Sequence, residues 1–178
     1  MINFIVSQIL GLIALVLVCI SYSFNEKGNF LIYQISANAF YSASFLSLGV
    51  FVGGLNTIVS IIRVITLYFF ERKDKSPPIS VYVLFAMSYL LVGNICFQMQ
   101  FDIMAIIAYE FFNVAMFIRD IGFTRILMVF PNILIVIYNI ISQTYTNAIL
   151  DLTEIIVLLI MIVKFSWSYR YKRYKHII

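Results

Sequence analysis

Long apolar runs, broken by short polar clusters, divide the chain into seven segments. A helix needs about 20 residues to cross about 30 Å of hydrocarbon, and every run is close to that length. The runs fall at residues 4–22, 30–48, 50–70, 80–98, 101–118, 124–142 and 145–165. The connections after the second, fourth and sixth runs are so short that the helices they join must be antiparallel. We therefore predict an all-α integral membrane protein with seven transmembrane helices.

The composition supports this class of protein. Apolar residues make up 63% of the chain and charged residues 11%, and the mean hydropathy is +1.01. A soluble domain of this length could not bury so much apolar surface or solvate itself with so few charges. We expect residues 4–22 to remain as a span, because Met1–Phe4 holds no basic residue and no signal-peptide cleavage pattern follows.

The basic residues predict the orientation. Eleven of the twelve lie in alternate connections and in the C-terminal segment: Lys27, Arg72, Lys73, Lys75, Arg119, Arg125, Lys164, Arg170, Lys172, Arg173 and Lys175. The twelfth, Arg63, lies within the third run. Loops on the cytoplasmic side of a membrane collect Lys and Arg. We therefore expect a multi-pass protein of the bacterial cytoplasmic membrane, with the N-terminus outside and the C-terminus in the cytoplasm.

The two halves of the chain share a pattern at an offset of 94 residues. At this offset the last three runs fall on the first three, Asn132 falls on Asn38, and Glu154 falls on Ser60. The extra run between the halves makes this a parallel repeat, a type that places solute sites near the membrane midplane. The predicted division is a first three-helix bundle at 1–72, a linker helix at 73–100, a second bundle at 101–166 and a basic-aromatic cytoplasmic tail at 167–178.

Short motifs along nearly the whole chain carry a family resemblance. They are Gln8…Gly11, Gln34…Asn38, Leu48-Gly49…Gly53, Asn56…Ser60…Arg63 and Tyr138-Asn139. Together they resemble the YgjV family of bacterial inner-membrane proteins, which is related to the PQ-loop superfamily of SWEET sugar carriers and nicotinamide riboside carriers. The resemblance implies a SWEET-like 3+1+3 fold. The proline-glutamine signature of that superfamily is missing, and Pro131 is the only proline within a run. This departure puts the SWEET-like gating mechanism in doubt more than the fold.

Several polar residues fall near one depth in the middle of the membrane. An ionised group there costs about 2.5–3.5 kcal/mol even on the lenient insertion scale, so each one calls for a function or a partner. Asn38, Ser60, Glu110, Asn132 and Glu154 share this depth, and Asn113 lies about one turn from Glu110.

These residues allow two interpretations. One is a polar cavity between the halves, and the other is hydrogen bonding that only joins helices, at about 0.6 kcal/mol for each bond. The cavity interpretation predicts a solute-binding set: Asn38, Ser60, Glu110, Asn113, Asn132 and Glu154. For Arg63 we predict a structural ion pair with one carboxylate, the alternative being a side chain that extends toward the cytoplasm.

Residues typical of a cofactor site or of catalysis are missing from the sequence. Cys19 and Cys96 are far apart, the single histidine is His176 in the tail, and no metal-ligand or nucleophile motif occurs. We expect no metal, no cofactor and no enzyme activity. The tail interleaves aromatic and basic residues directly after a span, which is typical of an anchor on the lipid bilayer rather than of nucleic-acid binding.

The sequence thus favours a carrier or facilitator for a small polar solute, such as a sugar, a nucleoside or a vitamin-like compound. It would work by alternating access around the midplane cavity. The alternative is a membrane scaffold, sensor or immunity-type partner that transports nothing. The identity of the solute, proton coupling and assembly into a homo-oligomer all stay open.

Overall fold

The computed structural model describes the backbone of residues 2–97, 99–141 and 145–175, and the side chains of residues 4–97, 99–141 and 147–164. These residues form seven α-helices and no strand, which confirms the predicted all-α class. The helices are α1 (Ile2–Ser23), α2 (Lys27–Ser47), α3 (Phe51–Arg72), α4 (Ile79–Ile95), α5 (Asp102–Phe117), α6 (Ile121–Ile141) and α7 (Tyr145–Lys175). Each predicted run coincides with one helix.

Three helices extend at least three residues beyond the apolar runs that predicted them. α2 begins at Lys27 instead of residue 30, α6 begins at Ile121 instead of 124, and α7 continues to Lys175. Backbone hydrogen bonding continues a helix past the last apolar residue wherever the next residues tolerate helical geometry, so hydropathy alone marks the ends poorly. The predicted tail at 167–178 is therefore helical as far as Lys175, while its side chains, including that of His176, lie outside the described part.

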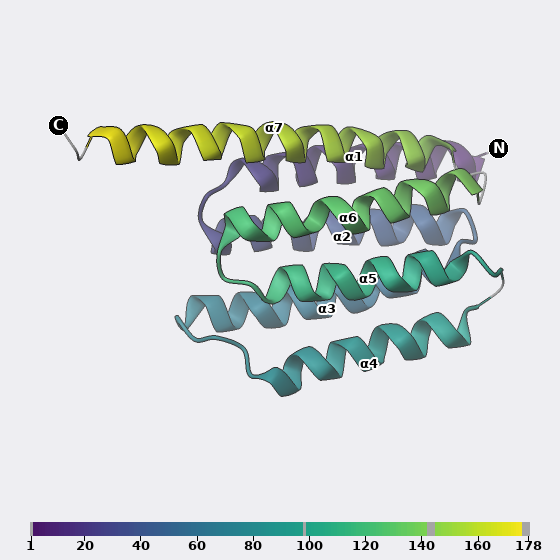
Figure 1. Cartoon of the computed structure of the whole chain (residues 1–178). Coiled ribbons are helices and arrows are strands. Elements are labelled where there is room, and N and C mark those ends of the chain that lie inside the picture. Colours follow the sequence, from purple (N-terminus) through teal and green to yellow (C-terminus); the bar gives the residue numbers. More distant parts are fainter. Residues whose placement is uncertain (1, 98, 142–144, 176–178) are drawn as a thin grey trace.

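Successive helices run antiparallel and form two layers (Figure 1). In one layer α2 lies between α1 and α3, and in the other α6 lies between α5 and α7. The layers meet where α1 contacts α7 and where α3 contacts α5. α4 lies at one edge of the bundle and contacts α3 and α5.

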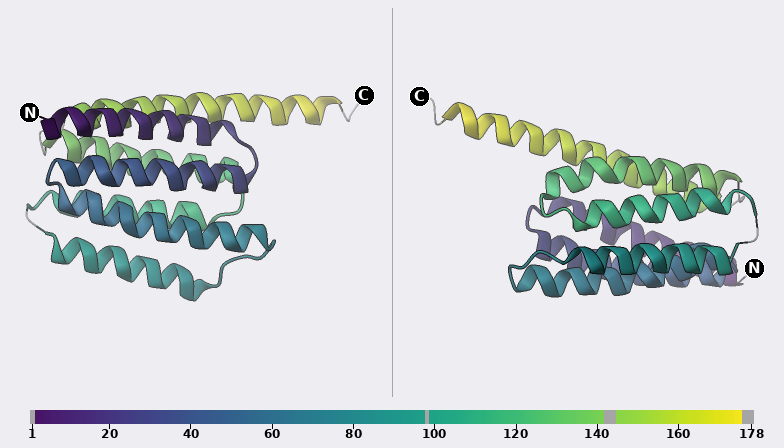
Figure 2. Two further views of the ribbon diagram at one scale, coloured as in Figure 1. Left: turned by 180° about the vertical axis from the view of Figure 1, so that it is seen from behind. Right: turned by 60° about the horizontal axis from the view of Figure 1, so that its bottom comes forward.

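The turns that follow α1, α3 and α5 all lie at one end of the bundle, as both views in Figure 2 also show. We call this the basic end, because Lys27, Arg72, Lys73, Lys75, Arg119 and Arg125 lie in or beside these turns. The turns after α2 and α4 lie at the opposite end and hold no Lys or Arg. The α2–α3 turn contains Gly49 with φ of +75°, a conformation that glycine adopts at little cost.

The bundle is apolar outside and polar inside. Large apolar side chains such as Leu84 (62% exposed) and Val163 (57% exposed) cover its surface, while Asn56, Asn113 and Arg125 are almost fully buried. A water-soluble protein shows the opposite distribution, whereas lipid solvates an apolar surface.

Length and composition identify three of the described helices as able to cross a membrane: Phe4–Ser23 of α1, Phe51–Arg72 of α3 and Ile121–Ile141 of α6. α4 is apolar but shorter, at 17 residues. The structure is thus that of a helical membrane protein, and the number of spans stays a prediction.

Candidate functional site

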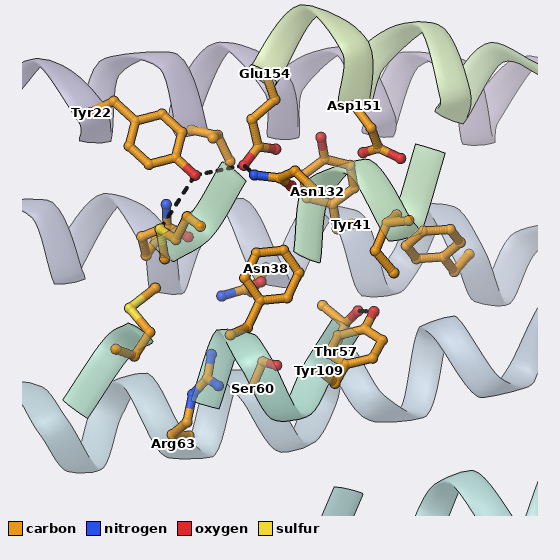
Figure 3. Close-up of a pocket in the computed structure, with 17 residues that line it drawn as sticks. Tyr22, Asn38, Tyr41, Thr57, Ser60, Arg63, Tyr109, Asn132, Asp151 and Glu154 are labelled. Atoms are coloured by element: carbon orange, nitrogen blue, oxygen red, sulfur yellow. Dashed lines mark hydrogen bonds between the residues drawn. The ribbon is translucent and has the colours of Figure 1, made fainter. Parts of the chain in front are cut away.

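A cavity lies between the two layers (Figure 3). Its volume is about 80 Å³, which is room for several water molecules at roughly 10–15 Å³ each. Six helices line it and α4 contributes nothing. The lining residues are Val18, Tyr22, Gln34, Asn38, Tyr41, Phe45, Thr57, Ser60, Arg63, Tyr109, Phe112, Met116, Met128, Asn132, Ile135, Asp151 and Glu154. Eleven of these seventeen side chains carry a polar group, which is unusual for the interior of a membrane protein.

Glu154 of α7 is the best-anchored acidic group in the cavity. Its side chain is buried, and its Oε1 atom accepts a hydrogen bond of 2.6 Å from the hydroxyl of Tyr22 on α1. The same oxygen accepts a hydrogen bond of 3.3 Å from Nδ2 of Asn132 on α6. These bonds join helices from both layers and hold the carboxylate in the lining of the cavity (Figure 3).

A second carboxylate lies one turn before Glu154 on the same face of α7. Asp151 is buried and its Oδ2 accepts a hydrogen bond of 2.6 Å from Nδ2 of Asn139 on α6. Residues three apart on a helix lie on one face, so the two acidic side chains form a single wall of the cavity. We call this the acidic wall.

Arg63 of α3 brings a cation to the same cavity. Its side chain is 2% exposed, and its guanidinium lies over the ring of Tyr89 with 5.4 Å between the guanidinium carbon and the ring centroid. Tyr89 comes from α4 and shares a hydrogen bond of 2.8 Å with Ser60. Nε and Nη1 of Arg63 have no hydrogen-bond partner among the described residues, and no described carboxylate forms an ion pair with this side chain. The ion pair predicted for Arg63 is therefore not formed within the described part of the chain.

Four of the six residues predicted to bind solute line this cavity, namely Asn38, Ser60, Asn132 and Glu154. Their role in binding stays a prediction, but the structure brings them to one place.

Glu110 and Asn113 do not line the cavity. Glu110 is half-buried, and its Oε1 has no hydrogen-bond partner among the described residues. Asn113 is fully buried and donates a hydrogen bond of 3.3 Å to the backbone carbonyl of Tyr82 on α4. Both residues directly follow cavity-lining residues of α5, Tyr109 and Phe112. One residue along a helix turns the side chain by about 100°, away from the cavity.

Six polar residues of the lining were not in the predicted solute-binding set. They are Tyr22, Gln34, Tyr41, Thr57, Tyr109 and Asp151. One of them carried a signal in the sequence, since Asp151 is acidic and lies one turn from Glu154 on the same face of its helix. The tyrosines carry no such signal, because an aromatic residue suits lipid, helix contacts and cavities alike.

Most of the residues that line the cavity occur in pairs separated by 94 positions in the sequence. Fourteen of the seventeen residues form seven pairs whose numbers differ by 94: Val18 and Phe112, Tyr22 and Met116, Gln34 and Met128, Asn38 and Asn132, Tyr41 and Ile135, Thr57 and Asp151, Ser60 and Glu154. Phe45, Arg63 and Tyr109 remain without a counterpart in the lining. Equivalent positions of the two halves therefore face one cavity, although the residue types at those positions differ.

Hydrogen bonds from two basic side chains join the layers at the basic end. Nζ of Lys27 on α2 donates to the carbonyl oxygen of Ile118 at 3.0 Å and to Oγ1 of Thr124 at 3.2 Å. Nη2 of Arg125 on α6 donates to the carbonyl oxygens of Tyr22 and Phe24, at the end of α1. Carbonyls at the C-terminus of a helix lack partners within the helix and favour a cation, so these bonds join the layers at that end.

Among the described residues, no three His, Cys, Asp or Glu side chains lie close enough together to hold a metal ion. Cys19 and Cys96 are free thiols, partly exposed and on different helices. The chemistry available at the cavity is therefore that of hydrogen bonding and charge, from one guanidinium, two carboxylates, and several amide and hydroxyl groups.

A comparison with curated proteins and another with solved structures found no match for the chain. A comparison with protein families matched residues 5–168 to Imp-YgjV, described as a bacterial inner membrane protein. The match covers all seven helices apart from the last turns of α7 and the first residues of α1. The chain belongs to the Imp-YgjV family of bacterial inner membrane proteins.

Proposed function

We propose that this protein is a carrier that moves a small polar solute through the inner membrane by alternating access. The observation that carries the proposal is the polar cavity between the two helix layers, which is lined by one guanidinium and two carboxyl groups, all of them buried. Ionisable groups buried within a membrane are costly to keep, and they commonly mark solute or ion pathways. The proposal assigns binding and movement of a solute to this cavity and no catalytic step.

The arrangement of the helices supports a parallel 3+1+3 repeat of seven spans. In such a repeat α1, α2 and α3 correspond to α5, α6 and α7. The contact between α1 and α7 then corresponds to the contact between α5 and α3, and both contacts are present. The seven residue pairs in the lining follow the same exchange. In this proposal a pseudo-twofold axis passes through the cavity between α2 and α6, and α4 is the linker outside the repeat.

Two structural features support movement of the two layers relative to each other. The cavity lies between the layers, and a few hydrogen bonds from Lys27 and Arg125 join the layers at the basic end. Breaking these bonds would open the cavity toward the basic end. In this structure the carrier would be closed at that end.

Orientation gives the first testable prediction. We expect the basic end to face the cytoplasm, because cytoplasmic loops collect Lys and Arg. In a background without Cys19 and Cys96, a cysteine at Asp74 should react with a membrane-impermeant thiol reagent only after the cells are broken. A cysteine at Met99 should react in intact cells, and a C-terminal reporter should be active only in the cytoplasm. Asp74 and Met99 suit this test because their side chains are exposed at opposite ends.

Reversed labelling would overturn the orientation. If both cysteines reacted from the same side, the number of spans would be even between them and the 3+1+3 repeat would fail.

Transport is tested with the purified protein in proteoliposomes. Vesicles loaded with an unlabelled solute should accumulate the labelled form of the same solute, for at least one member of a panel of amino acids, sugars and nucleosides. Vesicles without the protein are the control. A scaffold, sensor or immunity partner would show no exchange for any member of the panel.

A further inference from the structure

The charges of the cavity are separated onto opposite walls. Arg63 lies on α3 at one side, and the acidic wall of Asp151 and Glu154 lies on α7 at the other, with Asn38 between them (Figure 3). The 94-residue offset makes this separation clear, since Thr57 and Ser60 of α3 are uncharged where α7 has its two carboxylates. Two equivalent faces of the repeat have thus acquired opposite electrostatic character.

The side of the cavity that contains Arg63 is suited to bind an anionic group. A guanidinium can donate five hydrogen bonds, and a buried donor without a partner is unfavourable. Arg63 is almost fully buried, and its Nε and Nη1 atoms lack partners among the described residues. A carboxylate can accept two parallel hydrogen bonds from a guanidinium, which would satisfy this side chain.

The acidic wall is suited to bind a cationic group. Glu154 is held in place through its Oε1 by Tyr22 and Asn132, and Asp151 is held through its Oδ2 by Asn139. Two carboxylates on one helix face repel each other, and a cation between them would remove that repulsion. No described Lys or Arg forms an ion pair with either carboxylate.

We infer that the solute is a small zwitterion, bound with its anionic group at Arg63 and its cationic group at the acidic wall. This inference rests on the proposed carrier function and narrows it to one class of solute. The size of the cavity agrees with it. A cavity of about 150 Å³ admits benzene, so the 80 Å³ here suits the smallest zwitterions, such as glycine and alanine.

The test measures the thermal stability of the purified protein in detergent with chosen probes. Glycine and alanine carry both charges, while acetate carries only the anionic group and methylammonium only the cationic group. A ligand that binds only the folded state stabilises it by RT ln(1 + [L]/Kd), so the melting temperature rises with the logarithm of the ligand concentration once that concentration exceeds Kd. We expect at least one zwitterion to raise it and to bind at least tenfold more tightly than acetate or methylammonium. Equal binding of methylammonium and the zwitterions would identify a cation site, and no binding of any zwitterion would overturn the inference.

Substitutions of Arg63 test its contribution to binding separately from that of the acidic wall. Arg63→Gln should weaken zwitterion binding at least tenfold and leave methylammonium binding within twofold. Arg63→Lys keeps the charge and should give an intermediate loss, which guards against a variant that fails to fold. Arg119→Gln is the matched control, because Arg119 lies at the surface of the basic end and pairs with Asp74. Unchanged zwitterion affinity in a folded Arg63→Gln protein would contradict the inference.

Counterflow in proteoliposomes distinguishes failure of the inference from failure of the carrier proposal. If zwitterions bind but do not exchange across the membrane, the site stands and the carrier proposal fails. If a sugar or another uncharged solute exchanges and zwitterions do not, the carrier proposal stands and the inference fails.

Discussion

Glu154→Gln should lower transport by about 10- to 100-fold while the protein still inserts and folds. The substitution keeps the shape of the side chain and removes its charge, so the bonds from Tyr22 and Asn132 can still form to the amide oxygen. We therefore expect the substitution to weaken the interaction of the side chain with the solute and to leave its hydrogen bonds within the protein in place. A hydrogen bond to a charged group contributes about 1.5–3 kcal/mol, and each 1.4 kcal/mol is a factor of ten. The measurement is the initial rate of counterflow, with the melting temperature in detergent as the test of folding.

Glu110→Gln is the matched control for that experiment. It makes the same chemical change in a half-buried glutamate of α5 that does not line the cavity. We expect transport to remain within about twofold of the unmodified protein, since no contact with solute is lost. Equal losses for both variants would show that the cavity is not the site. A Glu154→Gln protein that melts at a much lower temperature and transports normally would instead favour a structural role.

Arg125→Ala should lower the free energy of unfolding by about 3 kcal/mol or more. Arg125 is 1% exposed, and its Nη2 donates hydrogen bonds to two carbonyls at the end of α1, in the other layer. Each bond to a charged donor contributes about 1.5–3 kcal/mol, and the substitution also leaves the two carbonyls without this donor. Unfolding in a denaturing detergent, followed by circular dichroism, measures the change.

The control for Arg125 is Arg119→Ala, six residues earlier at the same end of the bundle. Arg119 pairs with Asp74 at the surface, where both side chains are well exposed. Solvent screens such a pair, so its loss should leave stability within experimental error. If the two variants were equally stable, the hydrogen bonds from Arg125 would not hold the layers together.

The sequence predicted the helices well because each one is a long apolar run between polar turns. Counting along the helices also brought Asn38, Ser60, Asn132 and Glu154 to one level, and these four residues line one cavity. The face of each helix was harder to predict. In a soluble protein the polar face marks the solvent side, but lipid accepts the same apolar residues as the interior does, so the periodic signal is weak.

α5 illustrates this limit. Glu110 and Asn113 are its most polar residues near mid-membrane, yet Tyr109, Phe112 and Met116 are the residues that line the cavity. A polar residue in a membrane helix needs a partner, and a neighbouring helix can supply one. Asn113 finds its partner in the backbone of α4. Nothing in the local sequence distinguishes a partner of this kind from a solute.

The surroundings of Arg63 could not be predicted for a related reason. The sequence offers carboxylates on α5 and α7 at a suitable depth, which led to the predicted ion pair. The structure instead places the guanidinium over the ring of Tyr89, a residue of α4. Which of several distant side chains reaches Arg63 depends on how the helices associate, and that information is spread over the whole chain.

The position of Arg63 along the chain has a consequence for the synthesis of the protein. A nascent membrane protein enters the bilayer from its N-terminus, and α3 therefore arrives before α4 and well before α7. At that stage the guanidinium has neither the ring of Tyr89 nor the acidic wall nearby, and a lone cation in hydrocarbon is unfavourable. A long arginine side chain can reach the headgroups while the helix is still shallow. α3 would therefore reach its final depth only when α4 follows it, so α4 would guide the insertion of the helix before it.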